Sequence, residues 1–330
     1  MQPSDETQKV IDQIFKILLS DINNKKNRLF NANKQLVHYT SAIVAREIIE
    51  KEELWLRKTI FMNDYSEITY GKQYFYSLLE NPEFTAILNN NLKSLTNLNE
   101  LKKDYHAIIN DIEKKTYISC LSEHLPEEDS IGRLSMWRAY GNSSGVALVI
   151  NHKIIEKLNN SINDFIILPI TYSKNDFKKI FIKSLKIINN IVDDKQQFID
   201  YKNNIFKNLI LIMYFYVITL KHKGFWEERE WRIILTFLSS KEEKEILLPK
   251  TLKRTIENIK GNPEVIYKIN LNEFSFINSK GESLLEKIII GPNANAELLV
   301  ESFSEILKNK GFKPEQIKNM ITVSNIPLRY

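Results

Sequence analysis

Short runs with strand-like patterning recur along the chain, and their irregular spacing narrows the possible folds more than any other property. The runs include LVHYT, LWLR, KTYISCLSEHL, GVALVIN, EREWRIILTF and LLEKIIIGP. The segments between them differ widely in length, whereas a parallel α/β sheet needs regular alternation of strand and helix. The sequence therefore predicts an α+β fold with a mixed, largely antiparallel central sheet.

Helical patterning fills two long segments between these runs, at about residues 65–112 and 174–223. A further apolar pattern at helical spacing lies near the N-terminus and precedes the polar stretch DINNKKN. It consists of Val10, Ile11, Ile14, Ile17 and Leu18. We interpret residues 1–35 as an N-terminal helical extension, and residues 36–330 as one domain that carries the two helical insertions.

The composition sets limits on the class of protein. An apolar content of 43% is enough for a substantial core, yet no apolar run reaches the about 18 residues that cross a bilayer. The N-terminus is charged and lacks the apolar centre of a signal peptide, so a cytoplasmic protein with no membrane partner is expected. The net charge of +5, from 46 basic and 41 acidic side chains, fits a lysine-rich composition as well as an anionic partner.

Several common chemistries lack their sequence signals. Only nine glycines occur, and none forms the glycine-rich loop of a P-loop or Rossmann phosphate site. The five histidines show no metal-ligand spacing, so no metal site is predicted. The single cysteine, Cys120, excludes an internal disulfide, and its place inside a strand-like run favours a buried, inert thiol.

Three segments remain as candidates for a site. His38, Tyr39 and Thr40 end a strand-like run just before a helix, where side chains can reach a ligand. In ISCLSE and SMWRAYGNSSG, small hydroxyls accompany an aromatic pair. These residues are Ser119, Ser122, Ser143, Ser144, Trp137 and Tyr140. In the third segment, strand alternation places Glu228, Glu230 and Arg232 on one face and Trp231, Ile233 and Leu235 on the other.

Each segment also has a plain structural interpretation. The residues around His38 fit a loop that caps the following helix, with Ser41 as the capping residue. Trp137 fits an aromatic plug in the core. The face formed by Glu228, Glu230 and Arg232 fits a solvated, ion-paired surface.

Taken together, the motifs resemble those of a widespread bacterial family of unknown function, recognised by HYTS, MWxxYG and ExEWRI. The resemblance rests on LVHYTS, LWL and FMND, on CLSE, MWRAYG and GVAL, and on EREWRI and IIIGP, from about Leu36 to Asn293. The order of a His-aromatic-Thr strand, a serine-bearing strand and a strand opened by Glu-x-Glu also resembles the active site of ADP-ribosyltransferases. The resemblance implies an ADP-ribosyltransferase-like fold with NAD as co-substrate.

The resemblance also implies roles for individual residues. Glu230 would accept a hydrogen bond from a ribose hydroxyl and stabilise the oxocarbenium-like centre formed as nicotinamide leaves. Glu228 would orient or deprotonate the acceptor. The remaining residues would bind NAD: His38 at a ribose or phosphate, Thr40, Ser119 and Ser122 around the nicotinamide, and Tyr39 or Tyr140 stacked on its ring.

The acceptor stays open at this level. Protein and RNA are both expected candidates, since lysines recur in DINNKKNRLF, YSKNDFKKIFIKSLK and TLKRTIENIK, and Tyr172, Phe177 and Phe181 lie near one run as stacking candidates. We expect a toxin or defence effector, with a cognate antitoxin or inhibitor protein as a further partner. Two alternatives are NAD hydrolysis and a non-enzymatic RNA- or partner-binding module of a defence or toxin–antitoxin system.

Overall fold

The computed structural model describes residues 35–61, 65–92, 98–141, 144–161, 165–193, 202–237, 248–259, 261–292 and 295–327. The N-terminal extension expected at residues 1–35 lies outside these ranges, apart from its last residue. The chain forms two compact units. Described residues 35–58, 116–168 and 227–327 belong to one, here called the sheet unit, and described residues 59–115 and 169–226 to the other, the helical unit.

The sheet unit is named for its strands, which differ in length and burial. They are β1 (Gln35–Ser41), β2 (Glu53–Lys58), β3 (Thr116–His124), β4 (Gly145–Asn151), β5 (Phe165–Pro169), β6 (Glu230–Thr236), β7 (Leu252–Ile259), β8 (Asn262–Asn270), β9 (Leu285–Ile290) and β10 (Ile321–Val323).

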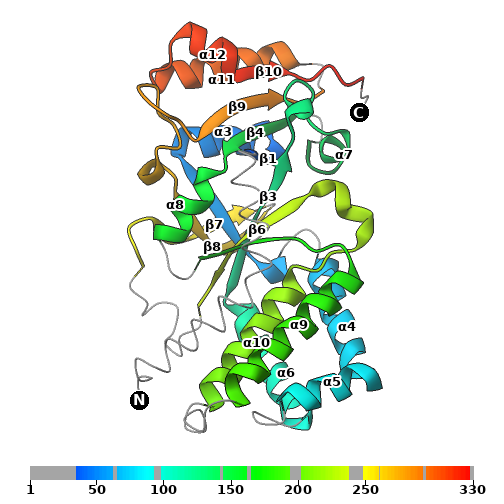
Figure 1. The fold of residues 1–330 in the computed structure, drawn as a ribbon. Helices are drawn as coiled ribbons and strands as arrows, with labels where there is room; N and C mark the ends of the chain where they lie inside the picture. Colours follow the sequence, from blue (N-terminus) through cyan, green and yellow to red (C-terminus); the bar gives the residue numbers. More distant parts are fainter. Residues whose placement is uncertain are drawn as a thin grey trace. The chain divides into compact units, whose positions relative to one another are not determined.

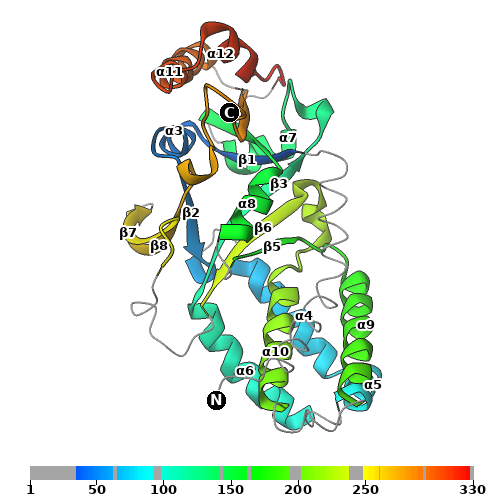
Figure 2. The same ribbon diagram turned by 60° about the vertical axis from the view of Figure 1, so that its left-hand side comes forward.

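The strands follow the order β10-β9-β4-β1-β3-β2-β8-β7, with β6 paired to β3 and β5 paired to β6 (Figures 1 and 2). β10 runs parallel to β9, whereas β1, β2, β3 and β4 pair antiparallel with their neighbours. The predicted class, α+β with a mixed and largely antiparallel sheet, is confirmed.

The sheet divides where β1 leaves β3. Val37 pairs with Ser122, but β1 then continues along β4 as far as Ser41 opposite Gly145. Further back on β3, Ile118 pairs instead with β2. Residues of β3 between these two pairings therefore face the point of division, and His38 of β1 lies there.

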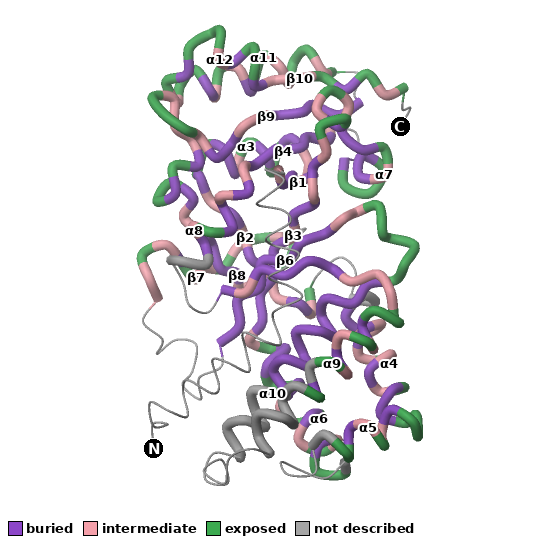
Figure 3. Tube along the Cα trace, in the orientation of Figure 1, coloured by how far each residue is buried: buried purple, intermediate pink, exposed green. Residues whose placement is uncertain are grey.

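Four helices of the sheet unit contribute side chains to its main core, on one face of the sheet. They are α3 (Ala42–Lys51), α8 (Lys153–Ser161), α11 (Ala296–Asn309) and α12 (Pro314–Met320). The Ser41 side chain caps α3 by accepting a hydrogen bond from the Val44 amide at 3.4 Å, as its position before the helix predicts. Strand β4 lies between β1 and β9 and is buried on both faces, which explains its continuous apolar sequence (Figure 3).

The helical unit contains five helices within the described residues, and their facing sides carry aromatic side chains. The helices are α4 (Tyr65–Leu79), α5 (Pro82–Leu92), α6 (Leu98–Lys114), α9 (Lys174–Asp193) and α10 (Lys202–Ile218). Phe75 packs edge-on against Phe181, and Phe84 stacks on the same ring. No helix in the described part of the chain combines the length and apolarity needed to cross a membrane.

Some elements are not evident in the sequence pattern. The lysine-rich stretch TLKRTIENIK contains strand β7, whose exposed and half-buried residues alternate weakly. Helices α8 and α12 span only nine and seven residues, too short to give a clear period. All three pack against or pair with other elements of the sheet unit, so tertiary contacts rather than local pattern specify them.

Candidate functional site

Glu230 and Arg232 lie on the face of β6 opposite the main core. Strand β6 pairs with β3, with Glu230 opposite Ser122, while Trp231 points into the core. Glu230 is only 6% exposed and Arg232 only 2%. The Arg232 Nε–H donates to Glu230 Oε1 at 2.7 Å, and the two groups form a buried ion pair. The interpretation of this face as solvated is wrong, because both charged side chains are buried.

Glu228 does not belong to β6. It ends a 3-10 turn, Lys223–Glu228, and Arg229 follows with a φ of 44°, in the left-handed region. The prediction that Glu228 shares the strand alternation of Glu230 and Arg232 is therefore wrong, because the backbone at Arg229 is left-handed and not extended. The Glu228 side chain is half-buried, and the Tyr140 hydroxyl donates to its Oε2 at 3.4 Å.

Tyr140 belongs to a helical segment that also carries Trp137. The segment consists of α7 (Leu134–Met136) and a single π turn, Trp137–Gly141. Tyr140 is 36% exposed, so its ring can reach a ligand. Trp137 is fully buried, and an alanine Cβ at Gly132 or Gly291 would lie within 2.9 Å of its ring. The interpretation of Trp137 as a core plug is confirmed.

Tyr39 lies on the same side of the sheet as Trp137. The two rings pack together in a second core, which is smaller than the main core. The Tyr39 ring meets Trp137 edge-on with centroids 4.8 Å apart, and Tyr39 is 5% exposed. Burial raises the pKa of the Tyr39 phenol despite the nearby charge of Arg133. In this conformation Tyr39 cannot stack on a nicotinamide ring, whereas Tyr140 can.

Three of the residues predicted to bind NAD lie on the other face of the sheet, the one that carries the main core. Leu36 of β1 and Tyr117 and Leu121 of β3 contribute to the main core, so alternation directs His38, Thr40 and Ser119 to that side. The structure therefore separates His38, Thr40 and Ser119 from Glu228 and Glu230 by the thickness of the sheet. The expectation that all nominated residues line one NAD site does not fit this arrangement.

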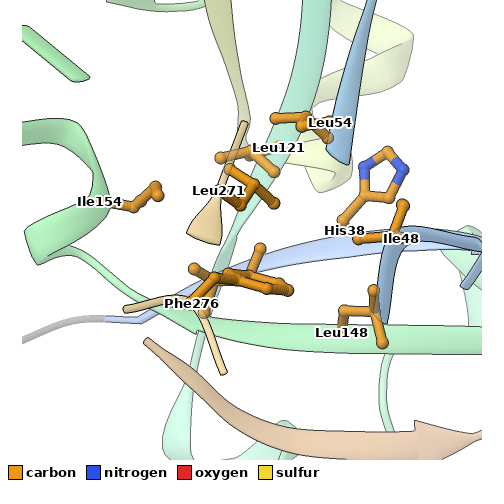
Figure 4. A pocket seen from close by; sticks show the side chains of 9 residues that line it. His38, Ile48, Leu54, Leu121, Leu148, Ile154, Leu271 and Phe276 are labelled. Carbon is orange, nitrogen blue, oxygen red and sulfur yellow. The ribbon is translucent and has the colours of Figure 1, made fainter. Parts of the chain in front are cut away.

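The surroundings of His38 are apolar (Figure 4). A cavity beside it has a volume of about 10 Å³, enough for one water molecule at most, and its walls come from Leu54, Leu121, Leu148 and other apolar side chains, including the ring of Phe276. The His38 Nδ1–H donates to the Cys120 carbonyl at 3.0 Å. Burial lowers the pKa of His38, and this hydrogen bond only partly offsets the effect. His38 is thus a neutral side chain at the point where the sheet divides.

A second charged group adjoins Ser122 on the Glu230 side. The guanidinium of Arg133 binds the Glu128 carboxylate through two hydrogen bonds, Nε to Oε1 at 2.8 Å and Nη2 to Oε2 at 2.9 Å. Its Nη1 donates to Ser122 Oγ at 2.8 Å, and Arg229 also binds Glu128. Burial alone would raise the pKa of Glu128, but its contacts with Arg133 outweigh burial and lower it.

His124 extends this group to the end of β3. Its Nε2–H donates to Asp129 Oδ1 at 2.8 Å, and Lys287 donates to the other oxygen of Asp129 at 2.7 Å. Burial lowers the pKa of His124 more than the hydrogen bond to Asp129 raises it. For Asp129, desolvation acts to raise the pKa, yet Lys287 and His124 together lower it.

Sequence reasoning missed Glu128, Arg133 and Arg229. Their segments show no periodicity: Glu128 and Arg133 are charges between the buried strands β3 and β4, and Arg229 is a charge directly before β6. Two residues proposed to stack on RNA bases are also unsuitable. Phe177 and Phe181 are each 1% exposed in the helical core, so that expectation is wrong, while Tyr172 is half-buried and retains partial access.

Fold and site together define an α+β protein in which Glu230, at the start of β6, lies opposite the buried Ser122, which in turn binds the buried Arg133. The profile of a family described as a protein of unknown function, DUF2971, matches residues 136–233. The match covers less than a third of the chain and extends from the Trp137 turn to β6, so the chain is similar to this family over that segment. No curated protein and no solved structure matches the chain.

Proposed function

We propose that this protein is an NAD-dependent ADP-ribosyltransferase that modifies a macromolecule through Glu228 and Glu230. The observation that carries the proposal is the placement of two carboxylates at the start of β6, one buried and paired with Arg232, the other half-buried beside the Tyr140 hydroxyl. Ser122 lies opposite Glu230 on the neighbouring strand. Four of the eight nominated residues thus lie close to one another in pairs, Glu230 opposite Ser122 and Tyr140 beside Glu228.

The chemistry of NAD cleavage fits these groups. Positive charge develops on the ribose as nicotinamide leaves, and a preorganised carboxylate stabilises it most where water is excluded. Arg232 pairs with Glu230 and places a positive charge beside this buried carboxylate. Glu228 is more accessible and suits the role of orienting or deprotonating an acceptor. His38, Thr40 and Ser119 have no part in this revised site.

Two other functions stay in competition. NAD hydrolysis would use the same carboxylates with water as acceptor. A non-enzymatic module that binds RNA or a partner protein is favoured by one observation, the burial and full pairing of Glu230 and Arg232, because such pairs also occur in purely structural roles.

One experiment separates the three. The purified protein is incubated with NAD labelled in its ADP-ribose part, together with total RNA and ribosome-free lysate, and both nicotinamide release and bound label are measured. Transfer requires release together with label on a macromolecule. Release without bound label would indicate hydrolysis, and the absence of both release and bound label would indicate the binding module.

Digestion of the labelled product then identifies the acceptor. Label removed by nuclease would assign RNA, and label that survives nuclease but disappears with protease would assign protein. If RNA is modified, expression without a cognate inhibitor should arrest growth through translation, which pulse labelling of new protein would detect.

A further inference from the structure

Arg133 contacts the backbone that leads into β6. Its Nη1 donates to the Glu227 carbonyl at 2.6 Å and to the Glu228 carbonyl at 3.2 Å. Its Nη2 donates to the Glu123 carbonyl at 2.6 Å. One buried guanidinium thus connects the end of β3 with the residues that precede Glu230.

Two further bonds hold the same turn. Ser122 Oγ accepts from Arg133 and donates to the Glu228 carbonyl, and the Glu123 amide donates to the Arg229 carbonyl at 3.0 Å. The carbonyls of Glu227, Glu228 and Arg229 are therefore all bound. This matters because Arg229 has a φ of 44°, a conformation that a non-glycine residue keeps only where its surroundings enforce it.

We infer that Arg133 is a positioning residue, which fixes the Glu227–Arg229 turn and thereby the placement of the Glu228 and Glu230 carboxylates. The claim that Arg133 fixes the turn concerns the backbone alone. The claim that this placement supports catalysis rests on the proposed function. Arginine suits this role because its planar fork offers five N–H donors in fixed directions, whereas a lysine ammonium is a compact charge with three. Glu128 balances the buried charge and orients the fork.

The test compares Arg133→Lys with a matched control, Arg57→Lys. Arg57 also forms a two-pronged pair with a glutamate, Glu264, at 2.9 and 3.2 Å, but that pair joins β2 to β8. Backbone hydrogen exchange is measured in peptides that cover residues 120–125 and 226–232. Arg133→Lys should speed exchange there roughly tenfold, and Arg57→Lys should leave it at the wild-type rate.

Kinetics supply the second readout. With nicotinamide release as the assay, Arg133→Lys should lower kcat by about 100-fold, the loss expected when reacting groups move by about 1 Å, with KM for NAD within about threefold of wild type. Added guanidinium should restore part of kcat in Arg133→Ala, and ammonium at the same concentration should not. Should Arg133→Lys fail to fold, Ser122→Ala replaces it, since this change removes one bond to the Glu228 carbonyl and leaves the charge pair intact.

The outcomes separate the two claims. The positioning role is overturned if a folded Arg133 variant exchanges backbone hydrogens over residues 226–232 at the wild-type rate. If the Arg133 variant does not fold, the same result in Ser122→Ala overturns it. Faster exchange with unchanged kcat would overturn its catalytic consequence. If the wild-type protein releases no nicotinamide, the proposed function fails, and the exchange data alone decide whether Arg133 fixes the turn.

Discussion

Replacing Glu230 by glutamine should destabilise the sheet unit, although the two side chains have the same shape. Glutamine removes the charge that compensates Arg232, which is 2% exposed and donates to Glu230 at 2.7 Å. Breaking one side of such a buried pair costs about 3–5 kcal/mol, because the buried charge that remains loses the charge opposite it. The glutamine oxygen can still accept a hydrogen bond, so we expect the lower end, about 3 kcal/mol.

Urea unfolding followed by tryptophan fluorescence measures this loss. For a unit of this size, each kcal/mol lowers Tm by about 2–4 °C, so the variant should melt about 6–12 °C below wild type. The control is Glu264→Gln, whose partner Arg57 is more exposed and should tolerate the change better. Replacing both members, as Glu230→Met with Arg232→Met, should recover most of the lost stability, because an apolar pair needs no compensation.

A loss of less than 1 kcal/mol in Glu230→Gln would refute this reasoning, since it would mean that water or another group already compensates Arg232. The result also governs the interpretation of activity. A loss of nicotinamide release in Glu230→Gln reports on catalysis only at a temperature where the variant is shown to be folded.

Three other predictions follow from the site. Glu228→Ala should reduce labelling of the macromolecule more than nicotinamide release, because Glu228 is placed to serve the acceptor; equal losses in the two assays would contradict this. Trp137→Ala should cost about 3–5 kcal/mol in urea unfolding, because the ring fills the small core beside Gly132 and Gly291, and a loss near zero would mean that the core collapses around the cavity. The free energy of unfolding should fall as pH drops below about 6.5, since the lowered pKa of His124 means that the unfolded chain takes up a proton first, and fall again below about pH 4, as the lowered pKa of Asp129 requires. Urea titrations between about pH 8 and pH 2 check the last prediction. Asp129→Asn should lose part of the lower-pH phase, because the lowered pKa of Glu128 also contributes to it, and a flat profile from about pH 8 to pH 5 would contradict the prediction.

The sequence predicts the fold class because the strand runs carry their own evidence. The strand-like patterns of β3 and β6 and the continuous apolar run of β4 can each be recognised within the segment itself. The irregular spacing of these segments excludes regular βαβ repeats. The Ser41 cap is likewise a local property, since the hydroxyl and the amide it binds are three residues apart.

The composition of the site depends on information that no single segment contains. Alternation tells which residues of one strand share a face, but not which face of the next strand they meet, and the pairing of Val37 with Ser122 decides that His38 and Glu230 lie on opposite sides. Glu228 leaves the strand pattern because the backbone turns at Arg229, and that turn is held by Arg133, nearly a hundred residues away along the chain. A side chain that binds distant carbonyls leaves no period in the sequence, so only the tertiary structure could show that these residues meet.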